Sequence, residues 1–260
     1  MRLRQHIINW HYKKLKSYPN IEQPISYNDK VQWLKLYDQD KNHIVCCDKS
    51  AVKKWVDERV PGITIPWTDS YPAVLKTTHD SGGTAFVNTF DDEKFALKKL
   101  KKRLNKTYGF QKGEWAYSLV KPQIIKETRI NNNDVEYKFH CCNGEVKWLQ
   151  MIWDRSSKVK ESIMDPEGKV LDLHLDHEMQ HVSQKYFCAD KEFNLLKHTA
   201  EILSKDWKYV RVDLYFAEKQ VWFGELTFWP KAGCYNSKDI FTFGSMMTFD
   251  LTTKKPMIII

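Results

Sequence analysis

The segment YVRVDLYFAEKQVWFGELTFWP, residues 209–230, is a predicted β-hairpin with acidic residues on one face. Apolar residues occupy every second position of each half, which is the period of a strand with one buried face. A three-residue turn at 218–220 places Asp213 directly opposite Glu225. Two carboxylates at that distance repel each other unless a cation lies between them, and Mg²⁺ bound through oxygens, with phosphate oxygens as further ligands, meets this need. A surface hairpin with a solvated polar face is the alternative.

Length and composition indicate a globular protein. The 260 residues are enough for one large domain or two lobes, and 42% of them are hydrophobic. No apolar run approaches the length of a membrane span, and the first residues are too polar for a signal peptide. The six cysteines lack Cys-x-x-Cys spacing, so we expect reduced thiols in a cytoplasmic protein.

The formal charge of +8, from 41 Lys and Arg against 33 Asp and Glu, favours an anionic partner. Nucleotides, nucleic acids, acidic sugars and membrane surfaces all qualify. The densest basic run, KKLKKRLNK at 98–106, has leucines at helical spacing, which indicates a solvated helix face. No aromatic residues interleave with these lysines, so we predict no nucleic-acid partner.

The pattern of apolar residues and turns predicts a mixture of helices and strands. Predicted helices span 27–38, with Asn28 as a candidate cap, 48–59, beginning at Asp48, 91–106 and 190–206. Predicted strands are 72–76, 85–90 and 121–130, followed by a hairpin around Asn143-Gly144 and the hairpin at 209–230.

The segment from Lys76 to Thr84, KTTHDSGGT, is a candidate phosphate-binding loop. A lysine at a strand end, followed by Ser81, Gly82 and Gly83, supplies one cation and exposed backbone N–H groups. The loop is not a Walker A motif, and a plain turn is the alternative. Further along, Glu127 closes an apolar strand, where it either accepts a hydrogen bond from an adenine amino group or is exposed to solvent.

In their order along the chain, these features resemble the ATP-grasp superfamily, and specifically its TupA-like branch. The resemblance covers nearly the whole chain and rests on YNDKVQWLKLYD, DKSAVKKWV, VLKTTHDSGG, GEWAY, KPQIIKE, EYKFHCCNGEVKWLQ, RVDLY and FGELTFWPKAG. It implies an α+β, ATP-grasp fold in which two lobes grip ATP. We expect an N-terminal helical segment at 1–47 and an ATP-grasp core at 48–260. The core would divide into a nucleotide-gripping lobe at 48–127 and a metal-binding catalytic lobe at 128–260.

The resemblance also implies roles for individual residues. The expected ATP contacts are Lys49 and Lys76 at the phosphates, Ser81, Gly82 and Gly83 in a mobile loop above them, Glu127 with the backbone of Thr128 to Ile130 at adenine, and Glu136 at the ribose. The expected metal ligands are Asp213, Glu225 and Thr227, although many ATP-grasp enzymes carry Asn where this chain has Thr227. Arg211 and Lys138 would be catalytic, with Arg211 stabilising the acyl-phosphate stage and Lys138 binding phosphate or the acid substrate.

The implied activity is ATP- and Mg²⁺-dependent ligation of an amine to a carboxylate through an acyl phosphate. The branch is associated with teichuronopeptide and other surface-polysaccharide biosynthesis, so the partners would be an acidic sugar or glycan and an amino acid, with peripheral association with a polysaccharide assembly system. A glycan or sugar kinase and a non-catalytic glycan-binding module are the alternatives. The spacing of His174, His177 and His181 does not match a helical zinc site, so we predict no zinc there.

Overall fold

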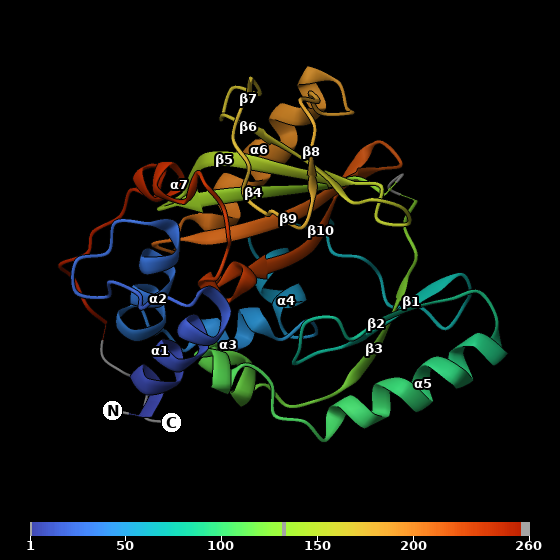
Figure 1. The fold of residues 1–260 in the computed structure, drawn as a ribbon. Coiled ribbons are helices and arrows are strands. Elements are labelled where there is room, and N and C mark those ends of the chain that lie inside the picture. Colours follow the sequence, from blue (N-terminus) through green and yellow to red (C-terminus); the bar gives the residue numbers. More distant parts are fainter. Residues whose placement is uncertain (1, 132–133, 256–260) are drawn as a thin grey trace.

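The chain folds into a small and a large sheet with helices packed around them (Figure 1). The computed structural model describes residues 2–131 and 134–255. The α-helices are α1 (Arg2–Leu15), α2 (Tyr27–Tyr37), α3 (Asn42–Cys47), α4 (Val52–Asp57), α5 (Phe90–Leu104), α6 (Asp190–Ser204) and α7 (Ile240–Met246). Short 3₁₀ turns are η1 (Phe110–Lys112), η2 (Trp115–Leu119) and η3 (Pro230–Gly233). The strands are β1 (Ala73–Thr77), β2 (Thr84–Val87), β3 (Ile124–Thr128), β4 (Glu136–Cys142), β5 (Glu145–Trp153), β6 (Lys160–Met164), β7 (Val170–Leu171), β8 (Gln180–His181), β9 (Val210–Ala217) and β10 (Gln220–Thr227).

The small sheet is antiparallel, in the order β2-β1-β3, and α5 packs against it. Ala73, Leu75 and Val87 of the sheet meet Ala96 and Leu100 of the helix in a core separate from that of the large sheet. The helix therefore buries a narrow apolar stripe and leaves its opposite side in solvent.

The large sheet has the order β10-β9-β4-β5-β6-β7, and β8 pairs with β6. Helix α6 covers one face, where the Phe139 and Phe193 rings lie 6.2 Å apart between centroids. Helices α2 and α7 cover one end of the other face, where Tyr27 packs edge-on against Trp148. The rest of that face looks toward the small sheet (Figure 1).

The segment 63–68 ties the two sheets together. The N–H of Phe223 in β10 donates to the carbonyl of Ile63 at 2.8 Å, and the N–H of Thr128 in β3 donates to Pro66 at 3.0 Å. One extended segment therefore carries hydrogen bonds to the edge strands of both sheets, which fixes their relative positions at the junction.

Two predicted helix starts are wrong. Helix α2 is capped by Ser26, whose side chain and that of Asp29 form a capping box, whereas Asn28 is buried and bonds to Tyr235. The helix predicted to begin at Asp48 is only the short α4, because the Asp48 carboxylate accepts the N–H groups of Ser50 and the next residue in a turn before it. The short α3 before that turn was not predicted.

The hairpin joining β9 and β10 has a different turn from the one predicted. Glu218 and Lys219, both with positive φ, form a two-residue turn. A bulge at Gly224 then shifts the register by one, so that Asp213 and Glu225 are still partners. A Cβ on Gly224 would lie 2.9 Å from the carbonyl oxygen of Asp213, which explains the glycine.

The bulge also reverses the expected side-chain pattern at the start of β10. Phe223 points into the main core with Leu226, while Trp222 lies on the opposite face beside its partner Tyr215.

In the described ranges, no helix is long and apolar enough to cross a bilayer. All six cysteines are free thiols.

Candidate active site

Strands β4, β9 and β10 place a row of charged side chains on the uncovered face of the large sheet. Lys138 is the register partner of Asp213, and Asp213 is in turn the partner of Glu225. Arg211 is the partner of Thr227 two residues along the same strands. Because alternate residues of a strand share a face, these side chains converge, and the predicted pairing of the two carboxylates is confirmed.

Arg211 bridges the two carboxylates. Its Nε and Nη2 donate to Asp213 at 2.6 and 2.7 Å, and Nη2 also donates to Glu225 Oε1 at 3.2 Å. Thr227 joins the network, since its Oγ1 accepts from Arg211 at 3.1 Å and donates to Glu225 at 2.9 Å. Burial acts to lower the pKa of Arg211, but the Asp213 charge outweighs it and raises that pKa well above its usual range.

Lys138 extends the row to Glu136. The Lys138 ammonium contacts Asp213 and lies 2.7 Å from Glu136. Arg155, just beyond β5, adds a bidentate pair to Glu136 at 2.5 and 2.8 Å. Burial acts to raise the pKa of Glu136, but these two cations prevail and lower it to about 2. Glu136 is therefore fully ionised, and its predicted ribose contact remains a prediction.

A second charged group lies on the small sheet. The buried carboxylate of Glu127 lies 2.6 Å from the ammonium of Lys76 on β1 and 2.6 Å from that of Lys53 on α4. Lys53 also lies 5.6 Å from the centre of the Trp67 ring. Glu127 thus orients two lysines, and its predicted contact with an adenine amino group is untested.

Lys49 is held against the glycine loop. Its backbone N–H donates to the carbonyl of Thr78 at 3.2 Å, and its ammonium contacts the carbonyl of Asp80 in the glycine loop. Burial acts to raise the pKa of Glu225, but the charges of Arg211, Lys49 and Lys138 outweigh it and lower that pKa.

The glycine loop is held by a buried carboxylate. Asp80 Oδ1 accepts a hydrogen bond from the hydroxyl of Thr77, and Asp80 Oδ2 accepts one from Arg103 Nε at 2.6 Å. A Cβ on Gly83 would lie 1.6 Å from Thr77 Oγ1 and 2.4 Å from Asp80 Oδ1, so only glycine fits. Gly82 has φ +80°, in the left-handed region. Arg103, on the basic helix α5, anchors the predicted lid.

An apolar cluster lies where the hairpin meets the segment 63–68. Ile65, Ala217 and Trp222 form it, with Ile130 and Tyr215 packed against them. The N–H of Thr128 is engaged by Pro66, so the backbone at 128–130 forms one wall of the junction. A flat aromatic base would find apolar contacts here, although base binding by Thr128 and Ile130 stays a prediction.

The oxygen donors of the row are of the kind that Mg²⁺ takes, and in this structure Arg211 and Lys138 are the cations on Asp213. Asp213 is buried, Glu225 is partly open, and the Thr227 hydroxyl lies beside them. Within 2–131 and 134–255, no three His, Cys, Asp or Glu side chains cluster as metal ligands. Two carboxylates leave most of the coordination shell to water and phosphate, which is how Mg²⁺ is usually held. The bound ion would neutralise phosphate charge.

A left-handed turn follows the hairpin that carries Asp213 and Glu225. Lys231, Ala232 and Gly233 all have positive φ, between 52° and 62°. Two side chains of α2 hold this strained turn. Gln32 donates to the carbonyls of Ala232 and Gly233, and the buried ammonium of Lys35 donates to Ala232 at 2.8 Å.

The histidine segment does not gather three possible metal ligands in the part of the chain that the structure describes. His174 Nε2 lies 3.1 Å from the buried carboxylate of Glu161, and the rings of His174 and His181 are 5.7 Å apart. His177 is exposed.

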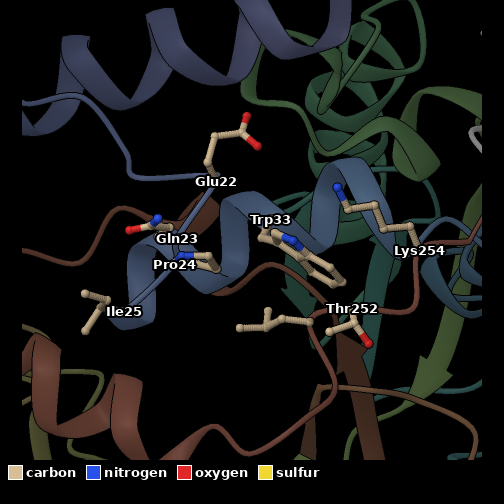
Figure 2. A pocket seen from close by; sticks show the side chains of 8 residues that line it. Glu22, Gln23, Pro24, Ile25, Trp33, Thr252 and Lys254 are labelled. Carbon is tan, nitrogen blue, oxygen red and sulfur yellow. The ribbon is translucent and has the colours of Figure 1, made fainter.

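A cavity of about 370 Å³ lies away from these charged groups. Trp33 lines it together with Pro24, Ile25, Leu251, Thr252 and Lys254, and Figure 2 shows the indole between Pro24 and Thr252. The nearby Glu22 is bound by Arg4 at 2.5 Å. Since none of its lining residues belongs to the charged row, we assign the cavity no part in the site.

Three site residues escaped sequence analysis. Lys53 lies one helical turn beyond Lys49, and that i, i+4 spacing was an available signal. Arg155 and Arg103 reach their acids across 19 and 23 residues of sequence. No local pattern marks such contacts.

Comparison with known proteins identifies the fold. The structure is similar to biotin carboxylase from Campylobacter jejuni, solved as a complex with a β,γ-ATP ligand, with a TM-score of 0.50, 14% identity, and coverage of 82% of this chain and 48% of that one. For D-alanine–D-alanine ligase from Helicobacter pylori the TM-score is 0.49 and the identity 16%, with coverage of 90% of this chain and 70% of that one. For the D-alanine–D-alanine ligase from Bacillus anthracis complexed with ATP, the TM-score is 0.46 and the identity 14%. The match covers 70% of this chain and 55% of that one, so this chain spans about half of that protein.

Sequence comparison gives the family. No curated protein sequence matches the chain. The family model described as TupA-like ATPgrasp matches residues 29–242, from within α2 to within α7. The predicted α+β ATP-grasp fold is therefore confirmed, and the chain belongs to the TupA-like ATP-grasp family.

Proposed function

We propose that this protein is an ATP- and Mg²⁺-dependent carboxylate–amine ligase that works through an acyl phosphate. One observation carries the proposal: the segment 63–68 joins β3, which carries Glu127 beside Lys76, to β10, which carries Glu225. A lysine for phosphate and a carboxylate for a magnesium ion therefore lie on strands that are tied to one segment. Phosphoryl transfer is catalysed mainly by such positioning and charge stabilisation.

The residues divide the work as follows. Lys49 and Lys76 hold the phosphates of ATP, and Glu127 orients Lys76. Asp213 and Glu225 would hold a magnesium ion, which would neutralise part of the phosphate charge. The substrate carboxylate attacks the γ-phosphorus and ADP leaves. An amine then attacks the acyl carbon and phosphate departs, while Arg211 stabilises the negative charge that develops on the carbonyl oxygen.

Closure of the glycine loop would exclude water from the acyl phosphate. In this structure the loop is tied to α5 by Arg103, whose Nη2 also donates to the carbonyl of Ser81 at 2.9 Å. Substitution of Arg103 would therefore change the anchoring of the lid without changing Lys49 or Lys76.

For the substrates, we propose an acidic sugar or glycan and an amino acid or other amine, used in making a surface polysaccharide. The net charge of +8 suits an anionic acid substrate. The association of the TupA-like branch with teichuronopeptide supports the same pair.

The test is a screen of ADP release with uronic acids and amino acids, followed by mass spectrometry of the products. We expect ADP formation that requires an acid, and an amide when the amine is present. Hydroxylamine in place of the amine should give a hydroxamate. A phosphorylated product that resists hydroxylamine would indicate a sugar kinase instead, and absence of ATP binding by calorimetry would indicate a binding module.

Asp213→Asn and Glu225→Gln should each lower turnover on the order of a hundredfold or more, because each removes charge that holds the metal. Asp172→Asn is a matched control, since that side chain is 99% exposed and away from the row. Normal activity of either site variant at limiting Mg²⁺ would contradict the metal assignment.

A further inference from the structure

The outer face of α5 carries a dense group of lysines. Five lysines of the helix are exposed: Lys94, Lys98, Lys99, Lys101 and Lys102. Lys98, Lys99 and Lys102 follow Phe95 at three, four and seven residues, so the four side chains share one stripe. Ala96 and Leu100 face the small sheet, so this stripe points away from the protein.

These lysines have no acidic partner among residues 2–131 and 134–255. Of the acids near the helix, Asp92 belongs to the capping box, Glu93 pairs with Lys126 at 2.7 Å, and Asp80 pairs with Arg103 on the inner side, which leaves the exposed Asp91 in the first turn. The outer face therefore presents a net positive charge over about two and a half turns, from Lys94 to Lys102.

Helix stability alone does not account for this charge. Basic residues in the last turn interact favourably with the helix dipole, which explains Lys101 and Lys102. Lys94, Lys98 and Lys99 lie earlier, where the dipole gives no such benefit. Repulsion between neighbouring lysines opposes the helix, so an external anion would relieve it.

Exposed phenyl rings accompany the lysines. Phe95, in the middle of the stripe, is 71% exposed, and Phe90, the first residue of the helix, is 72% exposed. A phenyl ring gains from contact with acyl chains and has no polar group for a sugar. Lysines combined with phenylalanine on a helix at the edge of the molecule are typical of binding to an anionic lipid surface (Figure 1).

We propose that α5 docks the protein on an anionic membrane, with Lys98, Lys99 and Lys102 on lipid headgroups and Phe95 at the acyl boundary. This goes beyond the proposed function and does not depend on it. The small lobe would lie against the bilayer through its outer helix, with β1 and the glycine loop on the other side of that helix.

The test is co-sedimentation with vesicles of phosphatidylcholine containing 30% phosphatidylglycerol, compared with phosphatidylcholine alone. We expect wild-type protein to bind the anionic vesicles and to be released by 0.5 M salt. Each lysine near such a surface contributes about a fivefold change in partitioning. The triple change Lys98→Gln, Lys99→Gln and Lys102→Gln should therefore lower the partition coefficient at least tenfold, and Phe95→Ser should lower it several-fold.

A charge-matched control changes three exposed lysines elsewhere: Lys191→Gln, Lys205→Gln and Lys238→Gln. It should lower partitioning less than threefold, and circular dichroism should show that both triple variants stay folded. Absence of wild-type binding, equal binding to neutral vesicles or an equal loss in the control would overturn the proposal. So would α5-dependent binding of a soluble polyuronate without vesicle binding. ADP release in solution reports separately on the ligase assignment.

Discussion

Lys35 offers a quantitative test of how the N-terminal helices support the site. Its ammonium is fully buried and donates to Gln32 Oε1 at 2.8 Å, to the backbone carbonyl of Lys112 at 2.7 Å and to that of Ala232 at 2.8 Å. Burial lowers the pKa of Lys35 from 10.5 to about 8, and the charge of the buried Glu114 offsets only part of that effect.

The sign and size of the pH effect follow from this pKa. Between pH 8 and 10.5 the unfolded chain binds a proton at Lys35 and the folded protein does not, so raising the pH through this range stabilises the fold. The whole range corresponds to about 3 kcal/mol, at about 1.4 kcal/mol for each pH unit. Below pH 8 the contribution is constant.

The assay is urea unfolding of wild type, Lys35→Met and Lys35→Gln at pH 7.5 and pH 10. Both variants lack the titrating amine, so wild type should gain about 2–3 kcal/mol relative to each as the pH rises. The two variants should differ from one another by the same amount at both values, although each leaves acceptors unpaired at a cost of about 1–3 kcal/mol. A difference between wild type and both variants that does not change with pH would refute the lowered pKa of Lys35.

Further predictions concern the glycine loop and the lysine pair. Arg103→Gln should speed amide exchange at 81–83 in the protein without nucleotide, because the anchor of the loop is lost; unchanged exchange would show that the loop is held without it. Gly83→Ala should weaken ATP binding at least tenfold while melting stays cooperative, since the new methyl group meets Thr77 Oγ1; wild-type affinity by calorimetry would contradict this. Lys53→Met should affect ATP less than Lys76→Ala does, and Lys76→Ala should weaken ATP more than adenosine; equal losses for both ligands would indicate a folding defect.

The sequence predicted the strand pairing of the site better than its turn. Alternation along 209–230, combined with an assumed three-residue turn, placed Asp213 opposite Glu225, as observed. The predicted turn was one residue too long, and the bulge at Gly224 restores the expected register from Glu225 onward. Between the turn and the bulge the register stays shifted, so Trp222 lies on the face opposite to the one expected. Bulges depend on close backbone contacts, which alternation cannot reveal.

The family resemblance supplied the residues of the site but not their partners. Lys49, Lys76 and Glu127 were predicted as separate ATP contacts, whereas the structure shows Lys53 sharing the Glu127 carboxylate with Lys76. Arg155 on Glu136 likewise depends on the pairing of β4 with β5. Such ion pairs form between elements whose approach is set by the whole fold, so motifs alone do not identify them.

The most direct test of the ligase proposal is transfer of oxygen from the acid substrate to phosphate. The acid found in the ADP-release screen is labelled with ¹⁸O in its carboxylate and turned over with ATP, Mg²⁺ and the amine. An acyl phosphate requires one labelled oxygen to leave with the phosphate, which mass spectrometry would detect as a gain of two mass units in each phosphate released. Amide formation with unlabelled phosphate would contradict the acyl-phosphate mechanism.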